Sequence, residues 1–312
     1  MTQSPTLTRP PTSSAPVLRK SKRRGADARA GYTFLLPWLL GFIALTVGPM
    51  ISSLYLSFTN YNLFEAPKWI GLDNYATLFQ DERFLQSVGV TLSYVVFGTP
   101  LKLAAALAVA MLLNSKRKGQ GFYRSAFYAP SLIGASVSIA IVWKAMFGDS
   151  GPVDQGLSFF GINLGGWVGN PSMTMPMMIL LTVWQFGAPM VIFLAGLKQI
   201  PADLYEAASM DGAGPVRKFF NITWPMLSPV IFFNLIMAII GTLQVFAIPY
   251  IMTQGGPARA TYFFTMYLYE SAFRFLRMGY ASAMAWIQLL LILTLTALAF
   301  WSSKRWVHYQ GK

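Results

Sequence analysis

The chain has 312 residues, of which 54% are hydrophobic and only 11% are charged, with a formal net charge of +13 at pH 7. Soluble domains carry roughly 25% charged residues, so this composition excludes an ordinary soluble protein and predicts an integral membrane protein. The absence of cysteine excludes disulfides and thiolate sites, and the single histidine, His308, lies too close to the C-terminus to serve a catalytic triad or a histidine metal site.

The N-terminal stretch, residues 1–30, combines a Pro-, Ser- and Thr-rich segment with a basic cluster made of Arg19, Lys20, Lys22, Arg23 and Arg24. Such a segment cannot bury a core, so we expect a disordered tail. Its basic residues could bind anionic lipid or RNA, but the positive-inside rule favours a role in orienting the first membrane span.

Six apolar segments follow, and each is long enough to cross the hydrocarbon core of a bilayer as a helix. The first is too long for a signal peptide and has no obvious cleavage site, so we expect it to stay in the protein. Prolines within the segments predict kinked helices around a pathway, although kinks are also ordinary packing devices. The predicted spans are Tyr32–Phe58, Ser87–Leu113, Ser125–Phe147, Met173–Leu197, Met226–Met252 and Ala281–Ser302.

Lysine and arginine are distributed unequally over the connecting segments. The two tails and the loops after the second and fourth spans hold 17 of them, whereas the opposite loops hold five. This bias predicts that both termini are cytoplasmic, which requires an even number of spans and agrees with six. It also explains most of the net charge without nucleic acid. The chain then divides into a tail (1–30), a first span with its outer loop (31–85), a core (86–302) and a C-terminal tail (303–312).

Two lysines fall inside the predicted spans. Lys144 is close to the outer end of its span and can extend its ammonium group to the interface. Lys102 lies ~18 Å from the cytoplasmic end of its span at 1.5 Å per residue. A charge at such depth usually faces a cavity or a partner. Lys102 could therefore line a translocation path, with a structural ion pair or a displaced span as the alternatives.

The loop after the fourth span, residues 200–228, has the signals of a helix-turn-helix elbow. Pro201 suits the first turn of a helix, and Asp203 favours the positive end of the helix dipole. Gly212 is placed to end this helix, and Gly214-Pro215 forces a turn before a second short helix. Because the loop follows the fourth span, we expect it on the cytoplasmic face.

The middle of this elbow carries small and acidic side chains. Ala207 and Ala208 allow another surface to approach closely, and Glu206 and Asp211 are expected to be exposed. The triplets Glu206-Ala207-Ala208 and Asp211-Gly212-Ala213, followed by Phe219, Ile222 and Pro225, resemble the EAA motif of ABC importer permeases. In that family the elbow is the coupling helix, which sits in a cleft of the cytoplasmic ATPase. The resemblance implies an ATPase-coupling role for Glu206, Ala207, Ala208, Asp211, Gly212 and Ala213.

Further motifs extend the resemblance over nearly the whole chain outside the N-terminal tail. They are similar to those of the carbohydrate-uptake permeases related to the maltose and glycerol-3-phosphate systems. The departures are Trp224, where the family usually has leucine, and Gln254, where a third glycine is common. The matching motifs are Gly71-Leu72-Asp73-Asn74-Tyr75, Phe193–Leu197, Gly255-Gly256-Pro257 and Gly279–Ala283.

The resemblance implies an all-α transmembrane domain of the type I ABC importer class, located in a bacterial or archaeal cytoplasmic membrane. The chain lacks a phosphate-binding G-x-x-x-x-G-K-[ST] motif, so the ATPase, with its ATP and Mg²⁺, must be another chain. The implied partners are a second permease, two ATPase subunits and an extracytoplasmic binding protein that delivers a sugar or a related solute. Alternating access would follow from closure of the ATPases.

Polar and aromatic residues of the fourth and fifth spans are candidates for solute contact, because sugars bind through hydrogen bonds and flat apolar surfaces. Hydrogen bonding between helices is the alternative role for such residues. The candidates are Trp184, Gln185, Asn234, Gln244 and Tyr250.

Three other classes of protein compete with the importer. An ion-coupled secondary transporter would favour acids within the membrane or inverted repeats, and the six predicted spans contain neither Asp nor Glu. A structural or regulatory membrane subunit would need no docking elbow. A membrane enzyme would need a catalytic constellation that the sequence lacks.

Overall fold

The computed structural model describes residues 24–115, 119–134, 136–162 and 165–308. Most of the predicted N-terminal tail and the end of the predicted C-terminal tail lie outside these residues. Contacts divide the chain into two units, Met1–Ser52 and Ser53–Lys312. The described elements are helical apart from one two-stranded hairpin.

The described part of the first unit, from residue 24 onwards, is one helical stretch. α1 (Arg24–Phe42) continues through a π-helical turn, η1 (Ile43–Val47), into α2 (Gly48–Ser57), which ends in the second unit. The helix begins at Arg24, inside the segment predicted as tail, because alanines 26, 28 and 30 favour helix. The stretch Tyr32–Ser57 is long and apolar enough to cross a membrane.

The second unit contains the hairpin and the remaining helices. The hairpin pairs Thr59 with Trp69 and Asn60 with Lys68 in antiparallel register. In chain order the elements are β1 (Thr59–Asn60), β2 (Lys68–Trp69), α3 (Asp73–Gln80), α4 (Glu82–Leu113), α5 (Gln120–Ile133), α6 (Val137–Phe147), α7 (Pro152–Ser158), α8 (Pro171–Trp184), α9 (Gly187–Leu197), α10 (Ala202–Met210), α11 (Pro215–Lys218), η2 (Phe219–Thr223), α12 (Trp224–Leu243), α13 (Ala247–Met252), α14 (Phe264–Tyr269), η3 (Glu270–Arg274) and α15 (Met278–Trp306).

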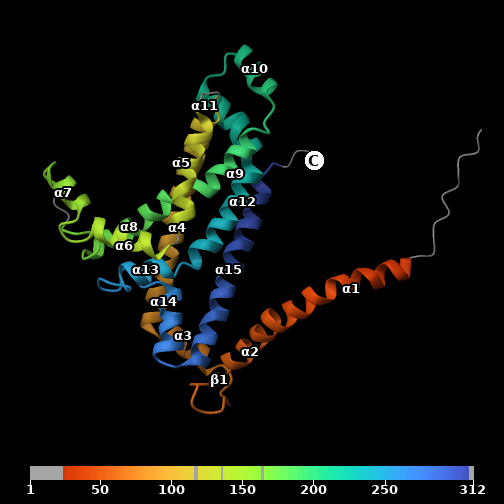
Figure 1. The fold of residues 1–312 in the computed structure, drawn as a ribbon, viewed down its shortest axis with the longest axis vertical. Helices are drawn as coiled ribbons and strands as arrows, with labels where there is room; N and C mark the ends of the chain where they lie inside the picture. Colours follow the sequence, from red (N-terminus) through yellow and green to blue (C-terminus); the bar gives the residue numbers. More distant parts are fainter. Residues whose placement is uncertain (1–23, 116–118, 135, 163–164, 309–312) are drawn as a thin grey trace, which may run out of the picture. The chain divides into compact units, whose positions relative to one another are not determined.

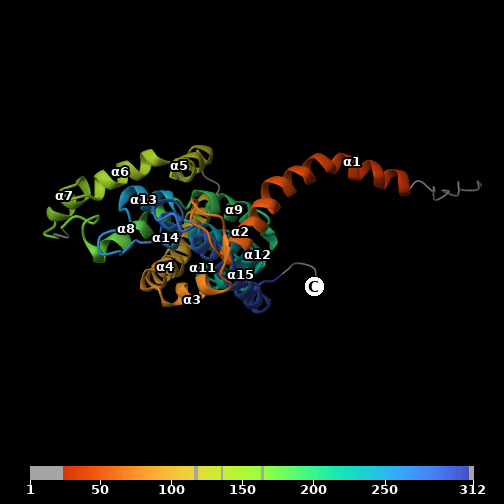
Figure 2. The same cartoon turned by 90° about the horizontal axis from the view of Figure 1, so that it is seen from below.

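The long helices of this unit form a bundle. α4, α12 and α15 run along its length, with α10 and α11 at one end and β1 and α3 at the other (Figure 1). α4 packs against α8, α9 and α12, and α12 packs against α15. Figure 2 shows α5, α6 and α7 along one side of the bundle, where α5 contacts α9 and α6 contacts α13.

Two apolar cores fill the bundle, and α4 contributes to both. The first core joins Phe84 and Tyr94 of α4 to residues of α8, α14 and α15. The second joins the other half of α4, from Leu103 to Leu113, to α9 and the start of α12. A side chain at Gly196 of α9 would meet Leu227 of α12 at 2.8 Å, so glycine lets these helices approach closely here.

Among the described residues, four helical stretches are long and apolar enough to span a membrane. The number rises to six if each bent pair of helices counts as one span. Three of the predicted spans, in which the prolines predicted kinks, are interrupted rather than continuous. The third divides into α5 and α6, the fourth bends by 44° between α8 and α9, and the fifth is interrupted between α12 and α13.

Proline explains the last two interruptions, because it cannot donate a hydrogen bond to the carbonyl four residues earlier. Pro189 leaves the carbonyl of Gln185 free, and the Ser131 hydroxyl of α5 donates to that oxygen at 3.0 Å. Pro249 leaves the carbonyl of Val245 free, and the Thr265 hydroxyl donates to it. Neighbouring helices thus satisfy the backbone groups that each break exposes.

The motifs 71–75 and 279–283 meet at the end of the bundle that carries the hairpin. The Asn74 side chain donates to the carbonyls of Ser57 and Thr59, at 2.8 and 3.0 Å. Gly279 packs against the same loop: a β-carbon there would lie 2.0 Å from the Thr59 carbonyl oxygen, and its own amide donates to Tyr61. These motif residues therefore join β1, α3 and α15.

Asp81 ties three helices together at the same end. Its carboxylate caps α4 through the Arg83 amide at 2.9 Å and accepts hydrogen bonds from the hydroxyls of Tyr267 and Tyr280. Partial burial raises the pKa of Asp81, but these hydrogen bonds outweigh that effect, so the pKa lies below its ordinary value. The ionised form of Asp81 therefore stabilises the contact of α4 with α14 and α15.

We expect Ser131→Ala to destabilise the protein by about 1–3 kcal/mol, because the Gln185 carbonyl loses its donor and the Ala188 amide loses its acceptor, the Ser131 oxygen at 3.0 Å. Thermal unfolding in detergent measures the change. Ser93→Ala is the matched control, since the Ser93 hydroxyl is exposed and bonds only within its own helix. Equal shifts for the two variants would contradict this account of the break.

We expect Asp81→Asn to lower the unfolding temperature at pH 7. A depressed folded-state pKa means that the Asp81 carboxylate stabilises the fold above its ordinary pKa of 3.8 and that this contribution is lost as the pH falls through the lower folded value. The difference in unfolding temperature between wild type and Asp81→Asn should therefore become smaller below pH 3.8. Asp73→Asn, at an exposed carboxylate in the first turn of α3, is the matched control and should change the unfolding temperature at pH 7 less than Asp81→Asn does.

Candidate functional site

The elbow predicted between the fourth and fifth spans is present in the structure. α10 ends where Gly212 adopts the left-handed conformation at φ +73°. The Ala213 amide donates to the Ala208 carbonyl at 2.8 Å, and the Gly212 amide donates to the Ser209 carbonyl at 3.1 Å. This pair of bonds is a Schellman motif, which glycine favours because a side chain would strain the positive φ. The second helix of the elbow, α11, begins at Pro215 itself, a residue that the sequence placed in the turn before it.

Side chains on the inner face hold the elbow to the bundle. The Tyr205 hydroxyl of α10 lies 2.9 Å from the Thr223 hydroxyl of η2, and the Lys218 ammonium donates to the Ser209 hydroxyl at 2.7 Å. Tyr205 and Ile222 also pack against the second core. A displacement of α10 would therefore be transmitted to η2 and to the start of α12.

The outer face of the elbow is uncovered. Glu206, Ala207, Asp211 and Gly212 are exposed, while Ala208 and Ala213 are half-buried. Neither carboxylate forms an ion pair with another described residue. Apolar side chains stand beside them, above all Met210 with 86% of its surface exposed. Small, acidic and apolar groups on one exposed face suit a surface that docks into a complementary cleft.

A cavity of about 190 Å³ lies between the two cores. Tyr94 and Lys102 reach it from α4, Thr182 from α8, and Thr242 from α12. The breaks after α8 and α12 border it, because Gln185 and Val245 also line its wall. Non-helical backbone within a membrane is tolerated where it is buried in protein or lines a cavity. The remaining lining residues are Met237, Ala238, Gly241 and Ile248.

Most polar groups of this cavity are already paired. The Tyr94 hydroxyl bonds to the Thr182 hydroxyl, and the Thr242 hydroxyl lies 3.1 Å from that of Thr99. The Gln185 side-chain amide donates to the Gly134 carbonyl at 3.0 Å. These pairs position the walls of the cavity and leave Lys102 as its one charged lining residue.

Only one of the five predicted solute-contacting residues, Gln185, lines this cavity. Trp184 packs beside Trp143, with ring centroids 5.7 Å apart, and Gln244 is exposed. Tyr250 stacks on Phe246 with centroids 5.2 Å apart.

Asn234 is buried on α12, and its side-chain nitrogen has no hydrogen-bond partner among the described residues. Sequence reasoning missed the cavity hydroxyls of Tyr94, Thr182 and Thr242. Their signal was the presence of isolated polar residues in apolar spans.

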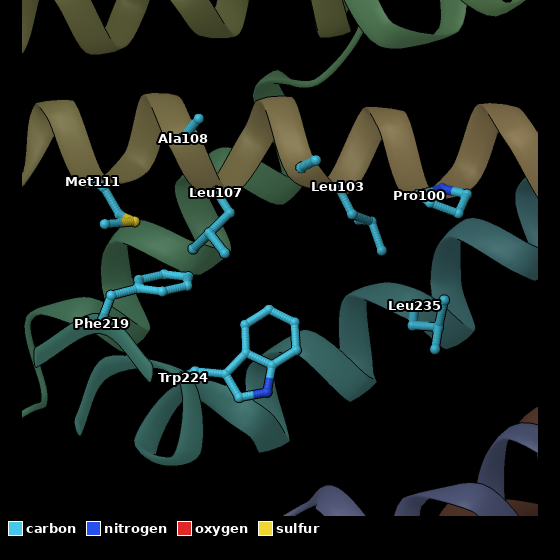
Figure 3. Close-up of a pocket in the computed structure, with 9 residues that line it drawn as sticks. Pro100, Leu103, Leu107, Ala108, Met111, Phe219, Trp224 and Leu235 are labelled. Carbon is cyan, nitrogen blue, oxygen red and sulfur yellow. The ribbon is translucent and has the colours of Figure 1, made fainter. Parts of the chain in front are cut away.

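A larger apolar groove of about 440 Å³ runs between α4 and the start of α12 (Figure 3). Phe219 and Trp224 face Leu107 and Met111 of α4 across it. Trp224, one of the two residues that depart from the family pattern, thus lies where the elbow meets α4. Among the described residues, no charged side chain lines the groove. Its lining residues are Pro100, Leu103, Ala104, Leu107, Ala108, Met111, Phe219, Trp224 and Leu235.

Known proteins with this architecture are membrane permeases. The family of binding-protein-dependent transport system inner membrane components matches residues 76–308. The probable ABC transporter permease protein YesP of Bacillus subtilis (strain 168) is 48% identical over 302 residues, which cover 96% of this chain and 98% of that protein. The lactose transport system permease protein LacF of Rhizobium radiobacter is 32% identical over 295 residues, covering 92% of this chain and 97% of LacF.

A solved structure has the same fold. It is a bacterial ABC transporter involved in the import of the acidic polysaccharide alginate. One of its chains matches this chain with a TM-score of 0.77 and 25% sequence identity, and the match covers 91% of this chain and 99% of that chain. These relatives are permeases rather than enzymes, and ATP hydrolysis falls to a separate ATPase. The family predicted from the EAA-like elbow is confirmed: the chain belongs to the binding-protein-dependent transport system inner membrane components, the permease subunits of ABC importers.

Proposed function

We propose that this permease translocates a sugar or a short oligosaccharide across a bacterial cytoplasmic membrane. The names of its relatives support the solute class, since LacF serves lactose transport and the similar solved structure imports an acidic polysaccharide. The observation that carries the proposal is the exposed elbow of α10 and α11, held by its inner face to helices that border a membrane cavity.

The membrane topology that we propose has six spans with both termini on the cytoplasmic side. The unequal distribution of 17 and five basic residues over the two sets of loops supports this orientation. The bent pairs α5–α6 and α8–α9 would each count as one span. The elbow and the C-terminal end of α15 then face the cytoplasm, and the hairpin faces the outside.

The proposed coupling surface consists of Glu206, Ala207, Ala208, Asp211, Gly212 and Ala213. The proposed partners are two ATPase subunits that hold ATP and Mg²⁺, a second permease and an extracytoplasmic binding protein. When the ATPases close, α10 moves, and the Tyr205–Thr223 contact transmits the displacement to η2 and α12. Because α12 borders the cavity, the same movement alters access to it.

For solute contact we propose Gln185, which lines the cavity, and the four other predicted residues, which do not line it. Trp184 and Tyr250 can offer flat apolar faces, and Asn234 and Gln244 can offer amides. A mild-detergent purification of the tagged chain tests the proposal. Co-purification of an ATPase and a second permease is the expected result, and reproducible recovery of this chain alone would contradict it.

We expect Gly212→Val to abolish ATP-driven uptake while the protein still inserts in the membrane. Valine is strained at φ +73°, so the Schellman motif would open and displace the exposed face of the elbow. Uptake in proteoliposomes and ATP hydrolysis, measured together, should show hydrolysis without transport. Gly214→Val is the matched control: φ is −73° there, a β-carbon meets nothing within 4 Å, and uptake should persist. Normal uptake by both variants would refute the coupling role of the elbow.

We expect Glu206→Lys to reduce the amount of ATPase that co-purifies with the permease, because it reverses a charge on the exposed docking face. Quantitative mass spectrometry of the purified complex measures this loss. Glu65→Lys makes the same charge change at an exposed site in the hairpin loop, at the opposite end of the bundle, and should leave ATPase recovery unchanged. Equal recovery for Glu206→Lys and wild type would remove Glu206 from the coupling surface.

A further inference from the structure

Among the described residues that line the cavity, Lys102 is the one with a charged side chain. It lies in α4, eleven residues before the helix ends at Leu113, which places it about 17 Å along the helix from that end. Its ammonium group forms no ion pair with any residue of the described chain. A charged side chain at this depth in a membrane raises the free energy of the protein unless it pairs with another group. The question is therefore which group pairs with Lys102.

The chain itself holds no acid that could neutralise Lys102 from the surrounding helices. Residues 84–148, 155–202 and 212–269 contain neither aspartate nor glutamate. These ranges include every cavity-lining position of α4, α8, α12 and α13. A buried ion pair within this chain, one of the alternatives left open by the sequence, is therefore excluded around the cavity.

Backbone carbonyls at the helix breaks carry no net charge, so they cannot neutralise Lys102, and those at three positions already accept a hydrogen bond from another side chain. Ser131 donates to the Gln185 carbonyl at 3.0 Å, and Gln288 donates to the Leu243 carbonyl at 2.9 Å. The carbonyl of Val245 accepts from Thr265. With the hydroxyls of Tyr94, Thr182 and Thr242 also paired, Lys102 is the strong donor that remains available in the cavity.

We propose that Lys102 binds the carboxylate of an acidic sugar, such as a uronic acid unit, as the solute passes through the cavity. This inference rests on the proposed function and narrows its solute class. One ammonium matches the single charge of a carboxylate, whereas a phosphate monoester carries about −1.5 to −2 and would call for further cations. Hydroxyl groups on one wall and the apolar side chains of Val245 and Ile248 on another suit a sugar ring.

The test uses the complete transporter, with its ATPase, second permease and binding protein, in proteoliposomes. The probes are trigalacturonate, its fully methyl-esterified form and maltotriose, so that the first two share one sugar backbone and the ester lacks the carboxylate charges. Wild type should take up trigalacturonate in an ATP-dependent manner. Lys102→Met should reduce the maximal rate of that uptake by about 10-fold or more, the equivalent of one hydrogen bond to a charged group. Lys102→Arg should retain most of it.

The methionine variant should still insert, because the substitution makes α4 more apolar. Lys144→Met is the matched control: Lys144 lies near the end of α6, is exposed and does not line the cavity, and trigalacturonate uptake should be unchanged.

Two results would overturn the proposal for Lys102. The first is wild-type transport of only the uncharged probes or of none of the three. The second is trigalacturonate uptake that Lys102→Met leaves unchanged. That result would mean that the Lys102 ammonium pairs with a carboxylate of the second permease or with water and not with the solute. Neither result affects the importer function itself. The importer function would be contradicted by different results: no ATPase that co-purifies with the chain, or solute uptake that does not require ATP.

Discussion

Backbone carbonyls that lose their helical partner within a membrane must find another donor, because lipid offers none. Pro189 and Pro249 free the carbonyls of Gln185 and Val245, and hydroxyls of Ser131 and Thr265 on neighbouring segments satisfy them. The bundle can therefore contain broken helices at its centre. Both breaks border the same cavity, so the polar site depends on these hydroxyl groups as much as on its own lining residues.

The cavity and the elbow belong to one mechanical assembly. α10 is held to η2 by Tyr205 and Thr223, η2 continues into α12, and α12 packs against α4 through the second core. α4 carries Lys102 where that core ends and the cavity begins. A force on the exposed face of the elbow can reach the cavity through packed helices. At the other end of the bundle, Asp81 joins α4 to α14 and α15.

The sequence predicted the elbow closely because its signals are local. Gly212 and Pro215 restrict the backbone themselves, so the end of one helix and the start of the next follow from residue type. The continuity of the spans was less predictable. Hydropathy detects an apolar stretch but not an interruption within it. A break in a membrane helix requires neighbouring groups that donate hydrogen bonds to the carbonyls it frees. Residue type alone does not predict the break: the helix is interrupted near Pro189 but continues through Pro100 in α4.

The sequence by itself determined the membrane class, the helix-turn-helix elbow and the absence of acids from the apolar spans, because composition and short-range spacing carry that information. Only the tertiary structure decided which polar residues meet. Tyr94, Lys102, Thr182 and Gln185 come from two helices far apart in the chain, and Trp184 and Gln244 do not join them. The physical reason is that packing angles, helix breaks and close contacts such as that at Gly196 set the distances between spans, and a single sequence does not reveal these.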